Sequence, residues 1–418
     1  MIHTRPVGEE NDRLTALERI LFDCLRARDH AATLEQLKTL SDQEWTSLVD
    51  LADELMVGPT LRHRLLSPAF TPALPDQLRQ IAGESQRRTA MANMRIHSDF
   101  RRVVLALHER AIPVIALKGL HLISLVYGDL ALRTTGDIDL LVPARDLISA
   151  GAVVEELGYA PLTAYHVSSR ALPYCDPHLP RFMKPGATPV EIHWHIVGPD
   201  STLSIDVRDV WDRAVPARIA GLDVLVFSHE DLLLHLCFHA TYQHLCEFSA
   251  RPWCDLAETI RRHGESMDWV QIVARAGRWR CRRGAYLALR LARDLLGAAV
   301  PDDVLESLRP AGFDERILRL AMLQRHRNSG LNVPFVQAWN QHTLAGRLRT
   351  YWSRIFLPKD QLTHMYNLPR FSRLVYATRL KDLVKHHWRT AVRLQRGDAA
   401  LTELDRRSIA LREFLAEP

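Results

Sequence analysis

Residues 114–142 decide the fold, and they read VIALKGLHLISLVYGDLALRTTGDIDLLV. Two apolar runs at the ends of this stretch, residues 114–117 and 138–142, are typical of strands. Successive side chains of a strand point to opposite faces, so Asp137 and Asp139 share one face while their apolar neighbours point into a core. Two carboxylates on one face repel each other unless a cation compensates them. A divalent metal with oxygen ligands meets that need, and Mg²⁺ suits such a site.

Alternating strands and helices surround this stretch and predict an α+β core. After the first strand, Gly119 leads into a helix that ends near Tyr127, and a second helix is expected over residues 144–157. Further strands are expected near residues 181–183, over residues 189–196, and in a hairpin formed by residues 215–219 and 222–227.

Helical spacing dominates on both sides of this core. Ser41 to Glu44 has the form of a capping box ahead of a helix, and a long polar helix is expected over residues 76–109. Beyond the core, Ser228 opens a helix that runs to about His244. We therefore predict three parts: an N-terminal helical region (residues 1–110), an α/β core (residues 111–228) and a C-terminal helical region (residues 229–418).

The composition is that of a soluble globular protein, with 418 residues of which 47% are hydrophobic and 25% charged. The first residues lack the apolar segment of a secretory signal, and no apolar run approaches the roughly 20 residues of a membrane span. We therefore expect a cytoplasmic protein with no membrane span. The net charge of +5 fits a phosphate-bearing substrate and does not demand nucleic acid. The six cysteines show no CxxC spacing and are expected to be reduced: Cys24, Cys175, Cys237, Cys246, Cys254 and Cys281.

A third acid, Glu191, lies in the expected strand over residues 189–196, on the same face as His193 and His195. If this strand pairs with the strand that carries Asp137 and Asp139, the three carboxylates converge, because paired strands lie about 4.8 Å apart. Three converging carboxylates are able to hold two metal ions for in-line displacement at phosphorus.

The turn after the first strand supplies positive charge and close backbone access. Lys118 and Gly119 lie on it, and a glycine there permits the backbone to approach a phosphate. Arg133, four residues before Asp137, offers a further charge-assisted contact, although a surface role fits it equally well.

These motifs together resemble the bacterial uncharacterised nucleotidyltransferase family of the DNA polymerase β-like superfamily. The resemblance rests on Lys118-Gly119, on Arg133-x-x-x-Asp137-Ile-Asp139-Leu-Leu-Val142, and on Val190-Glu-Ile-His-Trp194. Flanking features are similar too: the helix of Trp45, the Ser228-His-Glu-Asp231 helix with His235 and His239, and Asp255 followed by Asp268-Trp269. The resemblance implies a small mixed sheet of the polymerase β-like type between two helical regions.

The resemblance also implies roles for particular residues. Asp137 and Asp139 match the paired acids of the superfamily, and Glu191 matches its third acid, which together bind metal and nucleoside triphosphate. Lys118 and Gly119 take the place of the superfamily's Gly-Ser turn. The hydroxyl of that turn is missing here, so Lys118 is expected to offer a charge to the triphosphate instead.

Several histidines leave alternatives open. His193 is a candidate for proton transfer or for the second shell of the metal, with a structural role equally plausible, whereas a structural role is favoured for His195. His235 and His239, spaced i and i+4, would need Cys237 or His244 to complete a metal site, so packed core histidines are favoured.

The last stretch, residues 344–415, is helical and basic, with aromatic residues interleaved. It is suited to gripping nucleic acid through phosphate contacts and stacking. Amphipathic helices with arginines on their solvated face are the favoured interpretation.

The function we expect is transfer of a nucleoside monophosphate from a nucleoside triphosphate, with ATP as the expected donor, and release of pyrophosphate. The cofactor would be Mg²⁺, as two ions, with Mn²⁺ as an alternative. The acceptor is open: a small molecule, a peptide, a protein or RNA. The rival interpretations are a catalytically silent protein that binds a nucleotide or a partner, and an RNA-modifying or antitoxin-like module.

Overall fold

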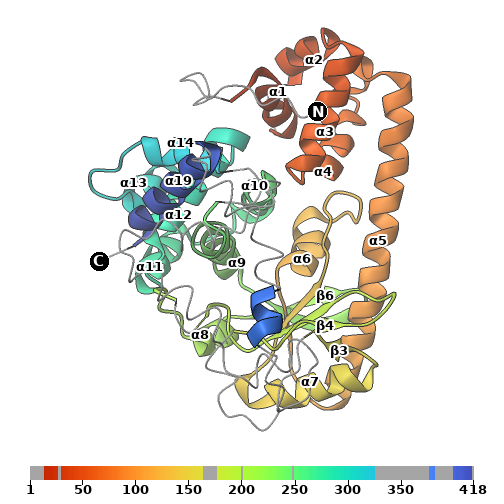
Figure 1. Ribbon diagram of the computed structural model, residues 1–418, viewed down its shortest axis with the longest axis vertical. Coiled ribbons are helices and arrows are strands. Elements are labelled where there is room, and N and C mark those ends of the chain that lie inside the picture. Colours follow the sequence, from red (N-terminus) through yellow and green to blue (C-terminus); the bar gives the residue numbers. More distant parts are fainter. Residues whose placement is uncertain are drawn as a thin grey trace.

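The computed structural model describes residues 14–26, 30–162, 177–198, 201–246, 249–324, 376–381 and 399–416. Within these residues the chain is an α+β fold with one seven-stranded mixed sheet among many helices (Figure 1). The strands are β1 (Ile115–Ala116), β2 (Ile138–Leu141), β3 (Ala160–Pro161), β4 (Phe182–Met183), β5 (Val190–His193), β6 (Val215–Ile219) and β7 (Leu222–Val226). The predicted fold class is therefore confirmed.

The order of the strands is β3-β4-β5-β2-β1-β7-β6. β2 and β5 run parallel, as do β1 and β7, whereas β1 and β2 are antiparallel, so the sheet is mixed. β6 and β7 form the predicted hairpin, with the residue pairs running from Val215 opposite Val226 to Ile219 opposite Leu222. The strand near Glu191 is shorter than predicted, because the backbone leaves the sheet after His193.

The N-terminal helices stand above the sheet in Figure 1, and one long helix connects them to it. In chain order they are α1 (Ala16–Leu25), α2 (His30–Lys38), α3 (Asp42–Glu54), α4 (Gly58–Leu65), η2 (Thr71–Ala73) and α5 (Asp76–Glu109). α3 begins with the predicted capping box, in which Ser41 and Glu44 satisfy each other's backbone amides. α5 is the predicted long helix and runs along one side of the molecule.

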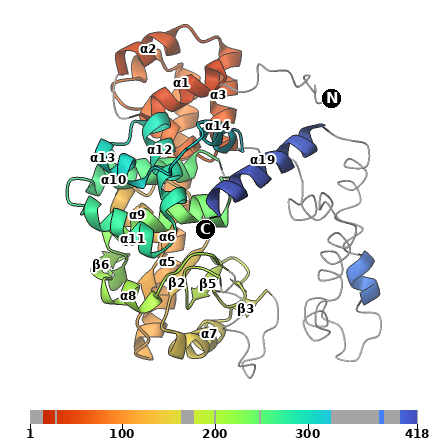
Figure 2. The same cartoon turned by 90° about the vertical axis from the view of Figure 1, so that its left-hand side faces the viewer.

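Short helical segments fill the connections of the sheet, and a helical layer follows it. The segments around the sheet are α6 (Lys118–His121), the π-helical η3 (Leu122–Tyr127), η4 (Ala144–Asp146), α7 (Leu147–Glu156) and α8 (Val207–Asp212). The later helices are α9 (His229–Phe238), the π-helical η6 (His239–Gln243), α10 (Arg251–His263), α11 (Trp269–Arg278), α12 (Arg282–Leu296), α13 (Asp302–Leu308), α14 (Arg316–Leu323) and α19 (Ala399–Leu415). Figure 2 shows these later helices beside the N-terminal ones, with the sheet at the other end of the molecule.

Two hydrophobic cores lie on opposite faces of the sheet. One core joins α5 and α7 to the sheet through residues such as Phe100, Val154 and Leu140. The other joins the N-terminal helices, the later helices and the opposite face of the sheet, where Leu117 and Leu141 contribute. Because both faces are covered, a polar side chain on the second face is held between the sheet and the helices.

Some predictions fall outside the described residues. Cys175 and most of the basic aromatic stretch over residues 344–415 lie there, as do the first thirteen residues. The five cysteines within the described chain are buried, and none of them forms a disulfide with another. Among the helices that the structure describes, none combines the length and the apolar character that crossing a bilayer requires.

Candidate active site

The site begins with the pairing of β2 and β5. The two strands are parallel, with Asp139 opposite Glu191 and Leu141 opposite His193. Their alternate residues, Ile138 and Leu140 on β2 and Val190 and Ile192 on β5, are all buried in the core beneath the sheet. Strand alternation therefore presents Asp139, Glu191 and His193 together on the opposite face. The predicted convergence of these acids follows from this register.

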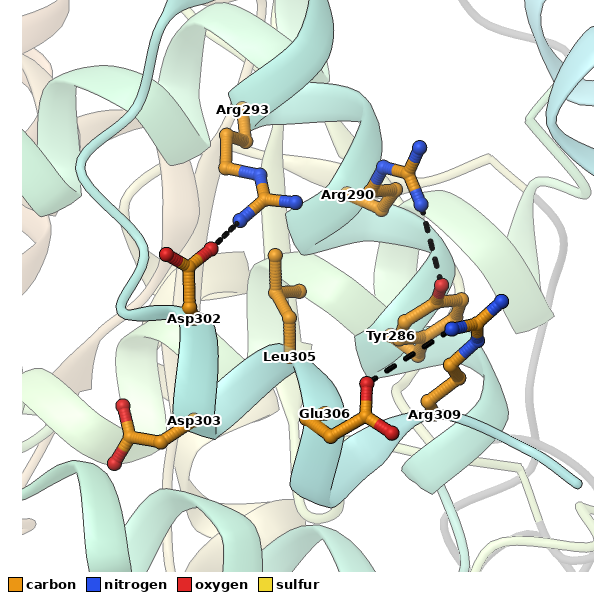
Figure 3. A pocket seen from close by; sticks show the side chains of 8 residues that line it. All are labelled: Tyr286, Arg290, Arg293, Asp302, Asp303, Leu305, Glu306 and Arg309. Atoms are coloured by element: carbon orange, nitrogen blue, oxygen red, sulfur yellow. Dashed lines mark hydrogen bonds and ion pairs between the residues drawn. The ribbon is translucent and has the colours of Figure 1, made fainter.

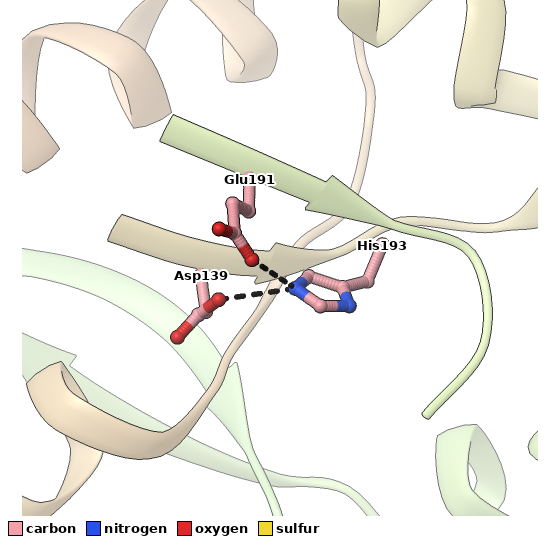
Figure 4. Close-up of side chains that lie close together, drawn as sticks. All are labelled: Asp139, Glu191 and His193. Atoms are coloured by element: carbon pink, nitrogen blue, oxygen red, sulfur yellow. Dashed lines mark hydrogen bonds and ion pairs between the residues drawn. The ribbon is translucent and has the colours of Figure 1, made fainter. Parts of the chain in front are cut away.

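The three side chains meet closely, as Figure 4 shows. His193 Nε2 lies 3.0 Å from Asp139 Oδ1 and 3.6 Å from Glu191 Oε2. One candidate ligand atom from each residue lies within 4.8 Å of those of the other two. Asp139 and His193 are buried, and Glu191 is partly exposed. His193, for which the sequence leaves proton transfer, a place in the second shell and a structural role open, thus lies in direct contact with two of the acids.

Asp137 lies just before β2 and completes the set of acids. Its carboxylate accepts a hydrogen bond from Nη2 of Arg181, a residue that immediately precedes β4. Nε of the same arginine lies 2.9 Å from Glu191 Oε1. Arg181 therefore bridges two of the three acids, and nothing in the sequence pattern singled it out.

Lys118 and Gly119 approach this cluster from the end of β1. Lys118 has a φ of 39°, a left-handed conformation that is uncommon for a residue with a side chain, and its Nζ lies 3.8 Å from Asp139 Oδ1. A Cβ atom on Gly119 would lie 2.1 Å from Thr135 Oγ1, so only glycine fits there. The hydroxyl of Thr135 therefore lies beside the Lys118-Gly119 turn, which itself lacks the hydroxyl of the superfamily's Gly-Ser turn.

Arg133 is buried rather than a surface residue. Its Nε and Nη2 donate to Asp255 of α10 at 2.7 and 2.9 Å, and Tyr127 Oη donates to the same carboxylate at 3.0 Å. Its Nη1 donates to the carbonyl of Thr134 at 3.2 Å. The pair ties the loop before β2 to the later helices, so the guanidinium predicted to contact nucleotide is engaged by Asp255.

A cavity of about 580 Å³ connects these features, which is in the size range of ligand pockets, roughly 300–1,000 Å³. All of the predicted acids line it, together with Lys118, Gly119 and Arg133. The lining residues that sequence reasoning did not select are Met56, Leu122, Thr135, Gly136, Arg181, Leu236, His239, His244, Arg251, Pro252 and Asp255. The helices α9, η6 and α10 therefore form the wall that faces the acids.

The surroundings of Asp137, Asp139 and Glu191 shift the pKa values of the three carboxyl groups in different directions. Burial and then the charges of Asp139 and Glu191 raise the pKa of Asp137. Burial alone would also raise the pKa of Asp139, but Lys118 and the hydrogen bond from His193 outweigh it and hold that pKa below its usual value. The nearby imidazole of His193 lowers the pKa of Glu191. The cluster therefore holds carboxylates close together, with Lys118, Arg181 and His193 as their cationic neighbours.

The pKa of the His193 imidazole is raised, whereas the pKa values of Asp139 and Glu191 beside it are lowered. Burial would lower the pKa of His193, but the hydrogen bond to Asp139 and the nearby carboxylate of Glu191 outweigh burial and raise it. Oxygen ligands with one imidazole nitrogen, close together and negatively charged in sum, are a donor set that accepts a divalent cation. The chemistry of the residues present therefore fits a metal such as Mg²⁺ or Mn²⁺.

The remaining histidines divide into core and cavity residues. His235 is buried, with its ring packed against Phe227 and Phe238, as favoured for a core histidine. His239 instead lines the cavity, where its Nε2 lies 3.1 Å from Nε2 of His244. His239 stacks on the ring of His235 at a centroid distance of 5.8 Å, so it extends from the packed core to the wall of the cavity.

His195 lies beyond the end of β5, away from the acid cluster. Its Nε2 lies 3.1 Å from the carbonyl of Ile205, and its Nδ1 accepts from the amide of Val197. These contacts to backbone fit the structural role that the sequence favours for it.

A second cavity, of about 360 Å³, lies between α12 and α13 (Figure 3). Its charged residues neutralise one another: Arg293 contacts Asp302 at 2.6 Å, and Arg309 contacts Glu306 at 3.9 Å. Arg290 donates to Tyr286 Oη at 3.3 Å. Because its arginines are already matched by acids or a hydroxyl, we assign it no ligand.

The mixed sheet with clustered acids on one face and a lysine turn beside them is an arrangement suited to a nucleotidyltransferase. The chain belongs to the uncharacterised nucleotidyltransferase family, whose profile matches residues 41–297. This match confirms the family resemblance seen in the motifs. A search of curated proteins found no match. The solution structure of the antibiotic-resistance factor ANT(2'')-Ia is similar over 47% of this chain and 96% of its own, with 18% identity and a TM-score of 0.31.

Proposed function

We propose that the protein is a metal-dependent nucleotidyltransferase that moves a nucleoside monophosphate from a nucleoside triphosphate, ATP in the first instance, to an acceptor and releases pyrophosphate. The observation that carries this proposal is the meeting of Asp137, Asp139 and Glu191 in one cavity beside Lys118. A cluster of carboxylates suits the binding of divalent ions, and a neighbouring cation suits the binding of phosphate. Membership of the nucleotidyltransferase family supports the same class of reaction.

The residues that would hold Mg²⁺ or Mn²⁺ are Asp137, Asp139 and Glu191, with His193 as a further ligand candidate. When bound, such an ion neutralises charge on the phosphates and aligns the attacking and leaving oxygens. The chain's own contribution is to hold these donor atoms in place. The pairing of β2 and β5 fixes Asp139 against Glu191, and burial limits competing water.

Lys118 and Gly119 are proposed to receive the triphosphate. The ammonium group of Lys118 reaches the cavity from the end of β1, and its strained backbone is the kind of feature that a functional constraint maintains. Gly119 leaves room for the backbone and for the hydroxyl of Thr135 beside it. For Arg133 we propose a supporting role, in which its pair with Asp255 fixes the loop that carries Asp137.

Glu191 is the candidate to accept the proton of the attacking group. Its pKa is lowered by the nearby imidazole of His193, so it is ionised at neutral pH and able to act as a proton acceptor. Its carboxylate lines the cavity, and its side chain is partly exposed. An acceptor group that enters the cavity can therefore reach it.

The acceptor is proposed to lie against the wall of the cavity formed by the later helices. His239 and His244 both line it, and burial lowers the pKa of each, that of His244 to about 4. Neutral imidazoles both donate and accept hydrogen bonds, which suits a hydroxyl-bearing or amide-bearing acceptor. Leu236 and Pro252 add apolar surface beside them.

The test is release of pyrophosphate from each nucleoside triphosphate with Mg²⁺ or Mn²⁺, for the natural chain and for Asp137→Asn combined with Asp139→Asn. The proposal predicts turnover that needs metal and that the double variant loses by at least about a thousandfold, as expected when metal-holding groups are removed. Release at the natural rate by a folded double variant would contradict it. Thermal stabilisation by each triphosphate, with and without Mg²⁺, identifies the donor.

One observation favours a second candidate, a protein that binds nucleotide without turnover. Arg181 neutralises part of the acid cluster from within the chain, as an arginine would in a site that has no need of metal. Calorimetry separates the two candidates. A silent binder would take up nucleotide equally well in EDTA and would release no pyrophosphate.

A further inference from the structure

Arg181 occupies the place where a cation is expected. Its guanidinium donates to Asp137 through Nη2, while Nε lies 2.9 Å from Glu191 Oε1. Arg181 also lines the cavity that holds these acids. A single side chain thus spans two of the three carboxylates that we propose as metal ligands.

The hydrogen-bond donors of Arg181 are only partly satisfied. Although Nε is buried and close to Glu191, it has no hydrogen bond of acceptable geometry. The side chain as a whole is 37% exposed, compared with 8% for Arg133. An arginine with an unaligned donor and access to solvent can move at a lower energetic cost than one held by two aligned bonds.

Charge within the cluster shows what this arginine does there. Asp139 has Lys118 and His193 as its cationic neighbours, whereas the carboxylate of Asp137 pairs directly with Arg181 and also feels the charge of Lys118. Glu191 shares Arg181 and His193. Arg181 therefore supplies the positive charge that lets Asp137 and Glu191 lie together without a metal.

We propose that Arg181 is a displaceable counter-cation that leaves Asp137 and Glu191 when a divalent ion binds them, and then binds the phosphates of the donor nucleotide. This inference rests on the proposed function and adds a residue to it. Metal and arginine compete for the same carboxylate oxygens, so only one of them is able to hold both acids.

The destination of the displaced guanidinium follows from its chemistry. Once the acids are neutralised, a cation in the cavity is attracted to whatever anion remains there, and in a nucleotidyltransferase that anion is the triphosphate. A guanidinium carries five donors in a planar fork that matches phosphate oxygens in pairs. Arg181 would then tighten nucleotide binding only when metal is present, which makes metal and nucleotide binding cooperative.

The experiment is calorimetric titration of MnCl₂, without nucleotide, into the natural full-length chain, Arg181→Met and Arg181→Lys. Arg110→Met serves as the matched control, because Arg110 pairs with Glu156 on the surface and does not line the cavity. Circular dichroism establishes that each variant is folded. A second titration uses a non-hydrolysable ATP analogue in saturating Mn²⁺.

The proposal predicts that Arg181→Met binds Mn²⁺ about tenfold more tightly than the natural chain, because a charged hydrogen-bonding competitor has been removed. The analogue should bind about tenfold more weakly to it in Mn²⁺, and Arg181→Lys should fall between. Unchanged or weaker Mn²⁺ binding by folded Arg181→Met would overturn the role of Arg181 while leaving the proposed function intact. If the natural chain binds no Mn²⁺ at all, the proposed function itself is wrong.

Discussion

Two clusters of buried charge in this protein are built in opposite ways. In the layer of later helices, one carboxylate, Asp231 of α9, lies 3.0 Å from Arg213 and 2.6 Å from Arg275. At the sheet, three carboxylates gather around one lysine, one arginine and one histidine. The first cluster centres on a single buried carboxylate, whereas the second brings several carboxylates together.

The difference distinguishes a cluster that holds elements of the fold together from a cluster that is suited to binding a ligand. Asp231 is almost fully buried, and its partners come from the end of α8 and from α11, so the cluster fastens three parts of the chain together. The acid cluster at the sheet lines a cavity and brings three carboxylates together there. Carboxylates gathered beside open space are suited to a cationic ligand, whereas an ion pair buried between helices is not.

The largest expected effect is on stability, and it compares the loss of the Asp231 carboxylate with the loss of a carboxylate of the acid cluster. Asp231→Asn leaves the buried guanidinium of Arg275 without this anion, removes the closer of two carboxylates from Arg213, and should lower the free energy of unfolding by about 5 kcal/mol. Asp137→Asn removes a carboxylate whose pKa is raised by burial and by its neighbours, so it should change that free energy by less than about 1 kcal/mol. Urea unfolding in EDTA measures both. Equal losses from the two variants would show that the acid cluster also holds elements of the fold together.

Two of the arginines that line the cavity, Arg133 and Arg181, give a matched pair of smaller effects. Arg133→Met removes both guanidinium hydrogen bonds to the buried carboxylate of Asp255, leaves the one from the hydroxyl of Tyr127, and should cost about 3 kcal/mol of stability. Arg181→Met removes a half-exposed contact and should cost about 1 kcal/mol or less. The same unfolding measurement applies. A larger cost for Arg181→Met than for Arg133→Met would reverse the roles we assign to them.

A third prediction concerns the turn beside the acids. Gly119→Ala would force a Cβ to within 2.1 Å of Thr135 Oγ1, so the loop before β2 must shift, at a cost of about 1–3 kcal/mol. Nucleotide binding should weaken with it. Gly83→Ala in α5 is the control, because its nearest neighbour is 3.8 Å away and the change should be neutral or slightly stabilising. Comparable losses of stability from the two substitutions would show that Gly119 is no more constrained than an ordinary helical glycine.

The smallest effect is on the dependence of stability on pH. Burial lowers the pKa of His121 to about 3, below its usual value near 6.5, so the unfolded chain binds the proton more readily. Stability is therefore lost as the pH falls below about 6.5. Between pH 7.5 and 5.5 the natural chain should lose about 1 kcal/mol more than His121→Gln does. Parallel curves for the two proteins in urea titrations would contradict this.

Sequence alone gave the acids of the site but not their environment. Alternation along each strand is a local rule, so the face of Asp139 on its strand and of Glu191 on its strand could be predicted. The pairing of β2 with β5 then brings the two residues together. Arg181 could not be found, because it precedes a strand of only two residues in a stretch without periodicity. The bond between Arg133 and Asp255 joins residues 122 positions apart, which no local pattern reveals.

The later helices show a different limit. Spacing of i and i+4 predicts that His235 and His239 share one face, and their rings are indeed stacked, with centroids 5.8 Å apart. Spacing does not predict that this face leads from the core, where His235 is buried, to the cavity, which His239 lines. The division into parts at residues 110 and 228 stays a prediction, since one hydrophobic core includes residues from both helical regions and from the sheet.

The most direct test of the central claim is a crystal of the natural chain soaked in MnCl₂ and measured at a wavelength where manganese scatters anomalously. The account predicts an anomalous peak within ligand distance of Asp139 and Glu191, with the guanidinium of Arg181 moved away from both acids. Density that shows no manganese among these carboxylates, with Arg181 still bridging Asp137 and Glu191, would contradict it.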